Sequence, residues 1–301
     1  MLLRSFFHSQ RSLLLDPLTV PNLTMANYNV MYSERRQHMN SDQLVAIVTG
    51  GNGAIGKAIA QGIAEKGDFE VILACRDEGR ARRAVQDVIR ATGNHNVRYE
   101  LVDVSRRASV QALAERWRGP LHVLVNNAGA TPRRRLETPE GIEMQFATNV
   151  LGYFWMIQAF TGRLQRSAPA RVVNVASYWA GDLDLDDLEF KTRRYDNGRA
   201  YRQSKQANRM LTVAFAQRLE PDNIAVNACH PGDVNSKLSN DLGFGGSESP
   251  QAGARTPVWL ATDPAGHEQT GKYFEGMRPV RDRFAEDQHA IERLYQACLE
   301  Y

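Results

Sequence analysis

The sequence predicts a doubly wound α/β fold, in which helices cover both faces of a largely parallel sheet within a single domain. Two observations support this prediction. Six short runs rich in β-branched residues alternate with longer segments of helical spacing, and the short runs are almost continuously apolar. Strands covered on both faces have such runs, whereas half-exposed strands alternate. A ligand of such a sheet is expected at the carboxyl ends of the strands.

The predicted strands and helices follow one another without a linker-like stretch, so residues 41–301 are predicted to form one domain. The helix after the first strand is expected to end at Gly67, a C-cap, and another to begin at Thr138 with Pro139 in its first turn. The expected strands are QLVAIVT (43–49), FEVILAC (69–75), NVRYELVDV (96–104), LHVLVNNAG (121–129), ARVVNVAS (170–177) and IAVNACH (224–230).

Composition narrows the class of protein. The chain has 301 residues, of which 43% are hydrophobic and 24% charged, as in ordinary globular proteins. A net charge of +3 gives no support for a nucleic-acid partner, and no apolar run of about 18 residues predicts a transmembrane segment. Cys75, Cys229 and Cys298 lack CxxC or metal-ligand spacing. We expect buried, reduced thiols and no metal site.

Residues 1–40 differ from the rest of the chain. Their first fifteen residues contain Arg4 and Arg11, and no acidic residue precedes Asp16, a composition compatible with a mitochondrial presequence. The alternative is a disordered or wrongly assigned leader, with Met39 as the working start. The protein is therefore expected in the cytoplasm, or in the mitochondrial matrix if residues 1–15 are a targeting signal.

The stretch TGGNGAIG (49–56) joins the first expected strand to a helix and is expected to hold a diphosphate. Glycines let the backbone approach a ligand, and the helix N-terminus offers free N–H groups and positive partial charge. Such a fingerprint does not by itself define a reaction. The contacts are expected from Gly50, Asn52, Gly53, Ala54 and Ile55.

About 20 residues beyond the glycines, a dinucleotide site usually has an acid that binds the ribose 2′-hydroxyl. Here Cys75 and Arg76 occupy that place, followed by Asp77. A guanidinium pairs with a 2′-phosphate, so the sequence favours NADP(H) over NAD(H). In the alternative, Arg76 is a solvated loop residue and Asp77 a helix N-cap.

Tyr201 and Lys205 lie four residues apart, on one face of an expected helix. The pKa of a phenol is roughly 10, and a nearby ammonium lowers it, as does a cationic nicotinamide. Tyr201 could then exchange a proton with an alcohol or carbonyl oxygen. Ser177 ends an apolar strand and could hold that oxygen. Asn149 is polar within an apolar helix. Each residue alone also has a purely structural explanation.

Taken together and in order, the glycine turn, LVNNAG (124–129), Asn149, Ser177, YxxxK and the PG turn in NACHPGDVNS (227–236) resemble the single-domain short-chain dehydrogenases/reductases, which have a Rossmann-type fold. The resemblance covers nearly all of residues 43–301. It implies that Asn149, Ser177, Tyr201 and Lys205 are catalytic, with Asn149 holding a water and Lys205 also binding the ribose. The implied cofactor contacts beyond the glycine turn and Arg76 are Asp103, Val104, Asn127, Ala128, Gly129, Tyr201, Lys205, Pro231, Gly232, Val234 and Ser236. Asp103 or Ser105 could instead cap the next helix.

One motif departs from this family pattern. Compact members usually carry TGxxxGxG, whereas Gly50, Gly53 and Gly56 follow the TGxxGxxG spacing of the larger epimerases, and Ala54 replaces a glycine. The LVNNAG motif, the PG turn and the lack of chain for a sugar-nucleotide domain favour the single-domain type.

The insert between Ser177 and Tyr201, residues 178–200, is long. Together with ILACRD (72–77) and GKYF (271–274) it resembles the retinol dehydrogenase-like subgroup, which implies NADP and a lipophilic alcohol or carbonyl. The expected pocket walls are Tyr178, Trp179, residues 238–244 and the turn after Gly129. Residues 241–250 are expected to form a mobile lid, and Arg133, Arg134 and Arg135 solvated charges near the mouth.

The sequence thus predicts an NADP(H)-dependent alcohol dehydrogenase or carbonyl reductase acting on a small molecule. The alternatives are an epimerase or dehydratase and an NADP(H)-binding sensor or scaffold without turnover. The resemblance also implies a homodimer or homotetramer, formed through the helices that carry Asn149 and Tyr201.

Overall fold

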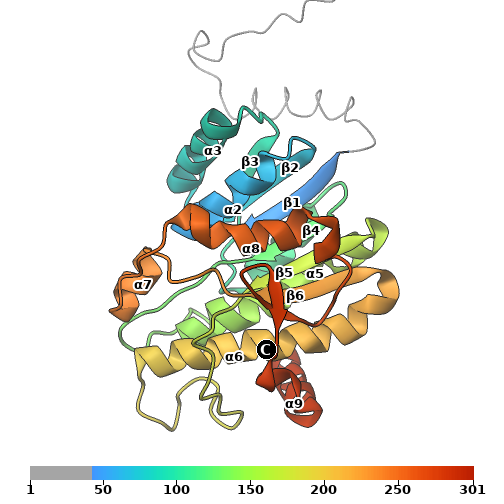
Figure 1. Cartoon of the computed structure of the whole chain (residues 1–301). Coiled ribbons are helices and arrows are strands. Elements are labelled where there is room, and N and C mark those ends of the chain that lie inside the picture. Colours follow the sequence, from blue (N-terminus) through green and yellow to red (C-terminus); the bar gives the residue numbers. More distant parts are fainter. Residues whose placement is uncertain (1–42) are drawn as a thin grey trace, which may run out of the picture. The chain divides into compact units, whose positions relative to one another are not determined.

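The computed structural model describes residues 43–301, of which Leu44–Tyr301 form one compact unit. The predictions made for residues 1–40 lie outside the described residues. The unit is built on an eight-stranded sheet of order β3-β2-β1-β4-β5-β6-β7-β8 (Figure 1). Every pair is parallel except β7 and β8. The predicted doubly wound class is therefore confirmed.

All six predicted strands form, and most are shorter than predicted at their carboxyl ends. The third ends before Asp103 and the fourth before Asn127, because these residues leave the sheet for loops at its carboxyl edge. The short β7–β8 hairpin was not predicted. The strands are β1 (Leu44–Thr49), β2 (Phe69–Cys75), β3 (Val97–Leu101), β4 (Val123–Asn126), β5 (Ala170–Val175), β6 (Ile224–Cys229), β7 (Tyr273–Glu275) and β8 (Arg278–Val280).

Helices pack on both faces of the sheet, as the alternation of strand residues requires. In β1, Val45 and Ile47 belong to one buried cluster with α4, α5, α6 and α9, whereas Ala46 and Val48 belong to another with α2, α3 and α8. None of the helices in residues 43–301 is long and apolar enough to cross a bilayer. The helices are α2 (Ala54–Ala64), α3 (Glu78–Thr92), α4 (Arg107–Arg116), α5 (Gly152–Arg166), α6 (Asn197–Leu219), α7 (Lys237–Leu242), α8 (Pro250–Thr262) and α9 (Gln288–Leu299).

Two predicted helix boundaries are wrong. α2 ends at Ala64 with Glu65 as its C-cap, and the N–H of Gly67 closes a turn onto the Ala64 carbonyl at 3.2 Å. Pro139 is not in a first helical turn, since Gly141 N–H closes a tight turn onto the Thr138 carbonyl at 2.9 Å. The helical segment begins after Glu143, and its π-helical part (Phe146–Leu151) leads into α5.

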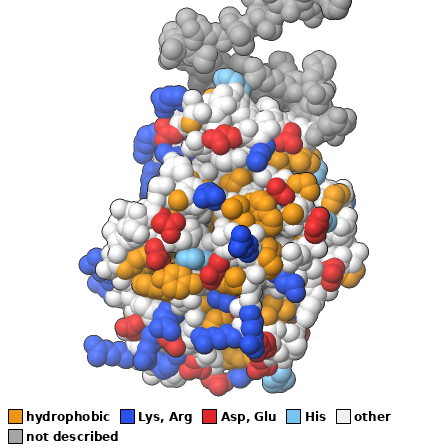
Figure 2. Space-filling view, in the orientation of Figure 1, with side chains coloured by type: hydrophobic (Ala, Val, Ile, Leu, Met, Phe, Trp, Pro, Cys, Tyr) orange, Lys and Arg blue, Asp and Glu red, His pale blue; other side chains and the backbone are white. Residues whose placement is uncertain are grey.

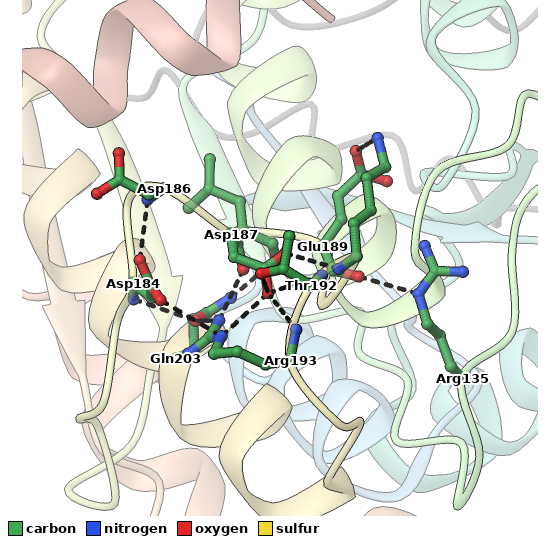
Figure 3. A network of polar contacts seen from close by, with 10 residues as sticks. Arg135, Asp184, Asp186, Asp187, Glu189, Thr192, Arg193 and Gln203 are labelled. Atoms are coloured by element: carbon green, nitrogen blue, oxygen red, sulfur yellow. Dashed lines mark hydrogen bonds and ion pairs between the residues drawn. The ribbon is translucent and has the colours of Figure 1, made fainter.

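The long insert before α6 is ordered around the buried carboxylate of Asp187 (Figure 3). This carboxylate accepts hydrogen bonds from the backbone N–H of Lys191 at 2.6 Å, from that of Arg193 at 3.0 Å and from the Thr192 hydroxyl at 2.9 Å. Burial alone would raise the pKa of Asp187. The N–H and hydroxyl donors outweigh it and hold the pKa well below its usual range.

Gln203 fastens this insert to α6, the helix that carries Tyr201 and Lys205. Its Nε2 donates to the Leu188 carbonyl at 2.8 Å, and its Oε1 accepts from Arg193 Nη2 at 3.0 Å. Gln203 is itself buried. The insert is therefore part of the core that surrounds α6.

The Asp187→Asn substitution should lower the melting temperature at pH 7 by about 5 °C, because the buried carboxylate loses charge-assisted hydrogen bonds. Since folding depresses the pKa of Asp187, its contribution is fully present above the unfolded pKa of roughly 4 and declines as the pH falls below that value. The melting temperatures of the native chain and the variant should therefore begin to converge as the pH falls below about 4 and meet only below the folded pKa of Asp187. The control is Asp186→Asn, whose side chain is 81% exposed. Equal effects of both substitutions would contradict the account.

Candidate active site

The glycine turn is closely packed and leaves the start of α2 open. Gly50 has φ of +64°, a region that favours glycine, and a Cβ at Gly56 would lie 2.3 Å from the Gly50 carbonyl oxygen. Gly53 is the N-cap of α2 and provides no capping side chain. The first N–H groups of α2, beginning at Ala54 and Ile55, can therefore face an anion. Gly51 was not among the residues predicted for this turn. A side chain has no room there either, because a Cβ on Gly51 would lie 2.8 Å from the Leu73 side chain.

Arg76 lies beside this turn because β1 and β2 pair in parallel, with Thr49 opposite Ala74. Its side chain is exposed. Asp77 N-caps α3, with its carboxylate accepting from the Arg80 N–H at 2.8 Å, so this part of the structural alternative is confirmed. Next to Arg76, the backbone N–H groups of Asn52 and Gly51 hydrogen-bond to Cys75, although burial still raises the pKa of this thiol to about 11.

The LVNNAG motif is fastened to β1 by Thr49, a residue not predicted to belong to the site. The Thr49 hydroxyl accepts from the N–H of Asn127 at 2.8 Å and of Ala128 at 3.0 Å, and Asn127 Nδ2 donates to the Thr49 carbonyl at 2.9 Å. Asn126 Nδ2 bonds to Asn174 Oδ1 at 3.0 Å in the neighbouring strand β5. These amides thus connect β4 and the loop after it to the neighbouring strands β1 and β5.

Asp103 and Val104 lie on the loop after β3, at the same carboxyl edge. The Asp103 carboxylate accepts from the Ser105 hydroxyl at 2.7 Å and from its N–H at 3.1 Å. The N-cap of α4 is Arg106. The alternative in which Asp103 or Ser105 caps this helix is therefore wrong. Val104 packs against Gly152, where a Cβ would lie 2.9 Å from the Val104 carbonyl oxygen.

Ser177, Tyr201 and Lys205 form one buried group at the ends of β5 and α6. They are at most 7% exposed. Lys205 Nζ donates to the Val175 carbonyl at 2.8 Å and lies 5.7 Å from the centroid of the Tyr201 ring. The Ser177 hydroxyl hydrogen-bonds to Tyr201. The structure therefore brings three of the four predicted catalytic side chains together.

Asn149, the fourth, lies in the π-helical segment and contacts the turn after Gly129. Its Oδ1 accepts from the Ala130 N–H at 2.8 Å, and its Nδ2 donates to the Ala130 carbonyl at 3.0 Å and to Ser204 Oγ at 3.1 Å. Ser204 directly precedes Lys205. Asn149 thus links the loop after β4 to the helix of the buried group.

Burial dominates the protonation of this group. Burial raises the pKa of Tyr201 to about 12, although the hydrogen bond to Ser177 acts in the opposite direction. Burial also lowers the pKa of Lys205 to about 7. The predicted lowering of the Tyr201 pKa by Lys205 is therefore wrong for the chain by itself, because desolvation also weakens the charge of Lys205. At neutral pH Tyr201 therefore keeps its proton.

Two further side chains, Tyr153 and Cys229, lie beside Lys205. Neither was predicted to belong to the site, because both look like ordinary core residues in the sequence. The Tyr153 hydroxyl donates to the Val175 carbonyl at 3.2 Å, the same acceptor that Lys205 uses, and the Tyr153 ring lies 5.4 Å from Lys205 Nζ. Cys229 is fully buried, and burial raises the pKa of its thiol against the opposing charge of Lys205. All three cysteines are free and buried, as predicted.

The PG turn follows β6. Gly232 has φ of +94°, and a Cβ there would lie 2.5 Å from a Glu248 carboxylate oxygen. Val234 and the Pro231 carbonyl pack against Gly253 of α8. The Ser236 side chain N-caps α7 by accepting from the Ser239 N–H at 3.1 Å. Ser236 therefore has a structural use that was not predicted.

The expected pocket walls also come together. The rings of Trp179 and Phe244 are 4.5 Å apart, and a Cβ at Gly129 would lie 3.1 Å from Leu238. Leu238 belongs to α7, which ends at Leu242, so the first two residues of the expected lid, Asp241 and Leu242, are part of a short helix. Arg135 is not a free charge near the mouth, because its Nε donates to the Glu189 carbonyl at 3.0 Å (Figure 3).

The buried group of Ser177, Tyr201 and Lys205 and the uncapped start of α2 lie at the same carboxyl edge of the sheet. A family model for short chain dehydrogenases matches residues 44–243. The chain belongs to this short-chain dehydrogenase family. It is accordingly an oxidoreductase of a family that uses nicotinamide cofactors, and the predicted Rossmann-type fold is confirmed.

Similar proteins point the same way. The chain is 34% identical over 272 residues to retinol dehydrogenase 13 of Homo sapiens, covering 83% of this chain and 81% of that protein. It is 37% identical over 258 residues to a probable oxidoreductase of Streptomyces antibioticus, covering 78% and 86%. The active-site complex of RhlG with NADP from Pseudomonas aeruginosa aligns with a TM-score of 0.62 at 27% identity, covering 78% of this chain and 95% of that one.

A Gly56→Ala substitution in this short-chain dehydrogenase should lower the melting temperature of the cofactor-free chain by about 5 °C, because the new Cβ has no room beside Gly50. The matched control is Gly53→Ala, whose Cβ would lie 3.3 Å from the same oxygen and should change the melting temperature by less than about 2 °C. Thermal melts of the two variants test the packing of the turn, and a reversed order would refute it.

Proposed function

We propose that this short-chain dehydrogenase is an NADP(H)-dependent alcohol dehydrogenase or carbonyl reductase that acts on a lipophilic small molecule. The observation that carries the proposal is the buried group of Ser177, Tyr201 and Lys205 beside the open start of α2, all at the carboxyl ends of parallel strands. A proton donor and a dinucleotide cradle at one sheet edge are what hydride transfer to a carbonyl needs.

The residues present fit a nicotinamide dinucleotide, since the N-cap of α2 is Gly53 and no side chain caps the first N–H groups of this helix. The glycine turn and the start of α2 hold the diphosphate, Arg76 the 2′-phosphate and Lys205 the ribose. The implied contacts at Asp103, residues 127–129 and 231–236 stay predictions. When bound, the cofactor supplies or accepts the hydride.

In the reducing direction Tyr201 donates its proton to the substrate oxygen. With a pKa of about 12, Tyr201 carries this proton throughout the neutral range. The Ser177 hydroxyl holds the same oxygen and stabilises its developing charge. The proton on Tyr201 is then replaced by way of Lys205, whose pKa of about 7 makes both protonation states accessible. Asn149 connects Lys205 to solvent through a water, as the family resemblance implies.

The preference for NADP(H) is supported by Arg76 and by the NADP complex of the structural relative RhlG. The lipophilic substrate is supported by the aromatic walls Tyr178, Trp179 and Phe244 and by the similarity to retinol dehydrogenases. The epimerase alternative has only the TGxxGxxG spacing in its favour. The sensor alternative leaves the buried Ser177, Tyr201 and Lys205 without a use.

Association into a homodimer or homotetramer stays a prediction. The helices expected to form the interface are partly covered within the chain, because Tyr295 of α9 packs 5.2 Å from the Phe154 ring of α5 and 5.3 Å from the Phe215 ring of α6. Within residues 43–301, an interface built on α5 and α6 would use the parts of these helices that α9 leaves uncovered. The predicted location stays untested, because it depends on residues 1–40.

The proposed reaction predicts that the full chain oxidises NADPH in the presence of a carbonyl from a panel of retinal, steroid ketones, quinones and aldehydes. Tyr201→Phe should lower kcat by at least about 100-fold, because the proton donor is lost. Tyr195→Phe is the matched control, since its hydroxyl bonds to the Pro132 carbonyl and to Gln145 instead. Binding of NADPH without turnover of any carbonyl would favour the sensor alternative.

Arg76→Ala should lower kcat/KM for NADPH by about 10- to 100-fold and leave that for NADH nearly unchanged, because only NADPH carries the phosphate that the guanidinium binds. Arg90→Ala is the control, since this exposed arginine pairs with Asp87 on the same helix. Initial rates with each cofactor give the comparison. A native chain that prefers NADH would contradict the role of Arg76 and leave the carbonyl chemistry intact.

A further inference from the structure

An acidic side chain that the proposed chemistry does not use lies beside Tyr201. Asp233 directly follows Gly232 on the loop after β6, and its Oδ2 accepts from the Tyr178 hydroxyl at 3.3 Å. The charges of Asp233 and of Tyr178 both contribute, after burial, to raising the pKa of Tyr201. Asp233 therefore acts electrostatically on Tyr201.

Aromatic rings continue from Asp233 along the expected pocket. Tyr178 packs edge-on against His230 at 4.6 Å and against Trp179 at 6.0 Å, and Trp179 lies 4.5 Å from Phe244. Tyr178 is 43% exposed and Phe244 38%, so both rings are open to a ligand. Figure 2 shows a patch of hydrophobic side chains between α7 and α6, edged by a histidine and by acidic side chains.

Three acids act together at this end of the pocket, against the opposing charge of Arg209. Glu248 lies next to Asp233, whose N–H donates to its Oε1 at 3.3 Å. Asp233, Glu248 and Glu275 all act on His230 in the same sense, although burial has the larger effect and lowers the pKa of its imidazole. Within residues 43–301, no lysine or arginine forms an ion pair with any of these three acids.

We propose that the substrate is a carbonyl compound or alcohol that carries a cationic group, a protonated or quaternary amine. The inference rests on the proposed function and deepens it. The aromatic faces of Tyr178, Trp179 and Phe244 attract a cation through their ring quadrupoles, and the Asp233 carboxylate supplies its counter-charge. The same field disfavours a substrate with a carboxylate or phosphate.

Two nearby cations are held by other groups, whereas Arg133 and Arg134 are exposed. Of the arginines after Gly129, Arg135 is turned toward the insert, where it bonds to the Glu189 carbonyl and to the Glu137 carboxylate. Lys237, on α7, pairs with Asp241 on the same helix. These two cations therefore do not offset Asp233.

The test uses the full chain with NADPH and three para-substituted benzaldehydes of similar shape, whose substituents are trimethylammoniomethyl, neopentyl and carboxymethyl. The native chain should show a kcat/KM for the cationic aldehyde about tenfold above that for the neutral one, with the anionic aldehyde lowest. High salt should reduce the difference. Asp233→Asn should lower kcat/KM for the cation about tenfold and change that for the neutral aldehyde less than about twofold.

Two further variants serve as controls. Asp233→Glu retains the charge and should retain the preference for the cation, and Glu115→Gln, an exposed acid on α4, should leave all three values unchanged. Equal kcat/KM for the cationic and neutral aldehydes in the native chain would overturn the inference. So would an equal loss for all three aldehydes in Asp233→Asn, or a rise in KM for NADPH alone, which would assign Asp233 to the cofactor. No reduction of any aldehyde would instead overturn the proposed function.

Discussion

The hydrogen bond from Lys205 Nζ to the Val175 carbonyl is the contact on which the site depends, because it joins the end of β5 to α6. A buried amino group needs a hydrogen-bond partner, and this one comes from the strand that continues into Ser177. Tyr201 lies one helical turn before Lys205, so the same contact sets the position of the phenol against the serine hydroxyl. Tyr153 supports it by donating to the same carbonyl from α5.

Around this contact, the insert and the loops at the carboxyl edge form a second layer. Gln203 of α6 hydrogen-bonds to the insert at the Leu188 carbonyl. At the start of the insert, the Trp179 ring packs against the Phe244 ring, which follows α7. Asn197 Nδ2 donates to the Asp241 carbonyl of α7 at 3.2 Å, and Gln145 Nε2 bonds to Asn197 Oδ1 at 2.9 Å. The pocket walls are thus held by polar contacts that reach back to the segment leading into Asn149. The same polar contacts therefore position both the pocket walls and the buried group of Ser177, Tyr201 and Lys205.

Much of this could be predicted from the sequence, because the strands and the motifs are local features. Apolar runs marked the strands β1 to β6, and the spacing of Tyr201 and Lys205 put them on one helix face. What could not be predicted depends on contacts across the fold. Pro139 has the local signature of a helix start, but the turn closed by Gly141 comes before the helix. Desolvation, which no motif encodes, reverses the expected change in the pKa of Tyr201.

Direct transfer of hydride is the central claim, and isotope transfer tests it most directly. NADPH labelled with deuterium at the transferable position of its nicotinamide ring, on each face in turn, would be turned over with a carbonyl substrate and the alcohol examined by mass spectrometry and NMR. The account predicts that one labelled face places deuterium on the carbinol carbon, in amounts equal to the NADPH consumed. An unlabelled alcohol with both faces, or deuterium lost to water, would contradict it.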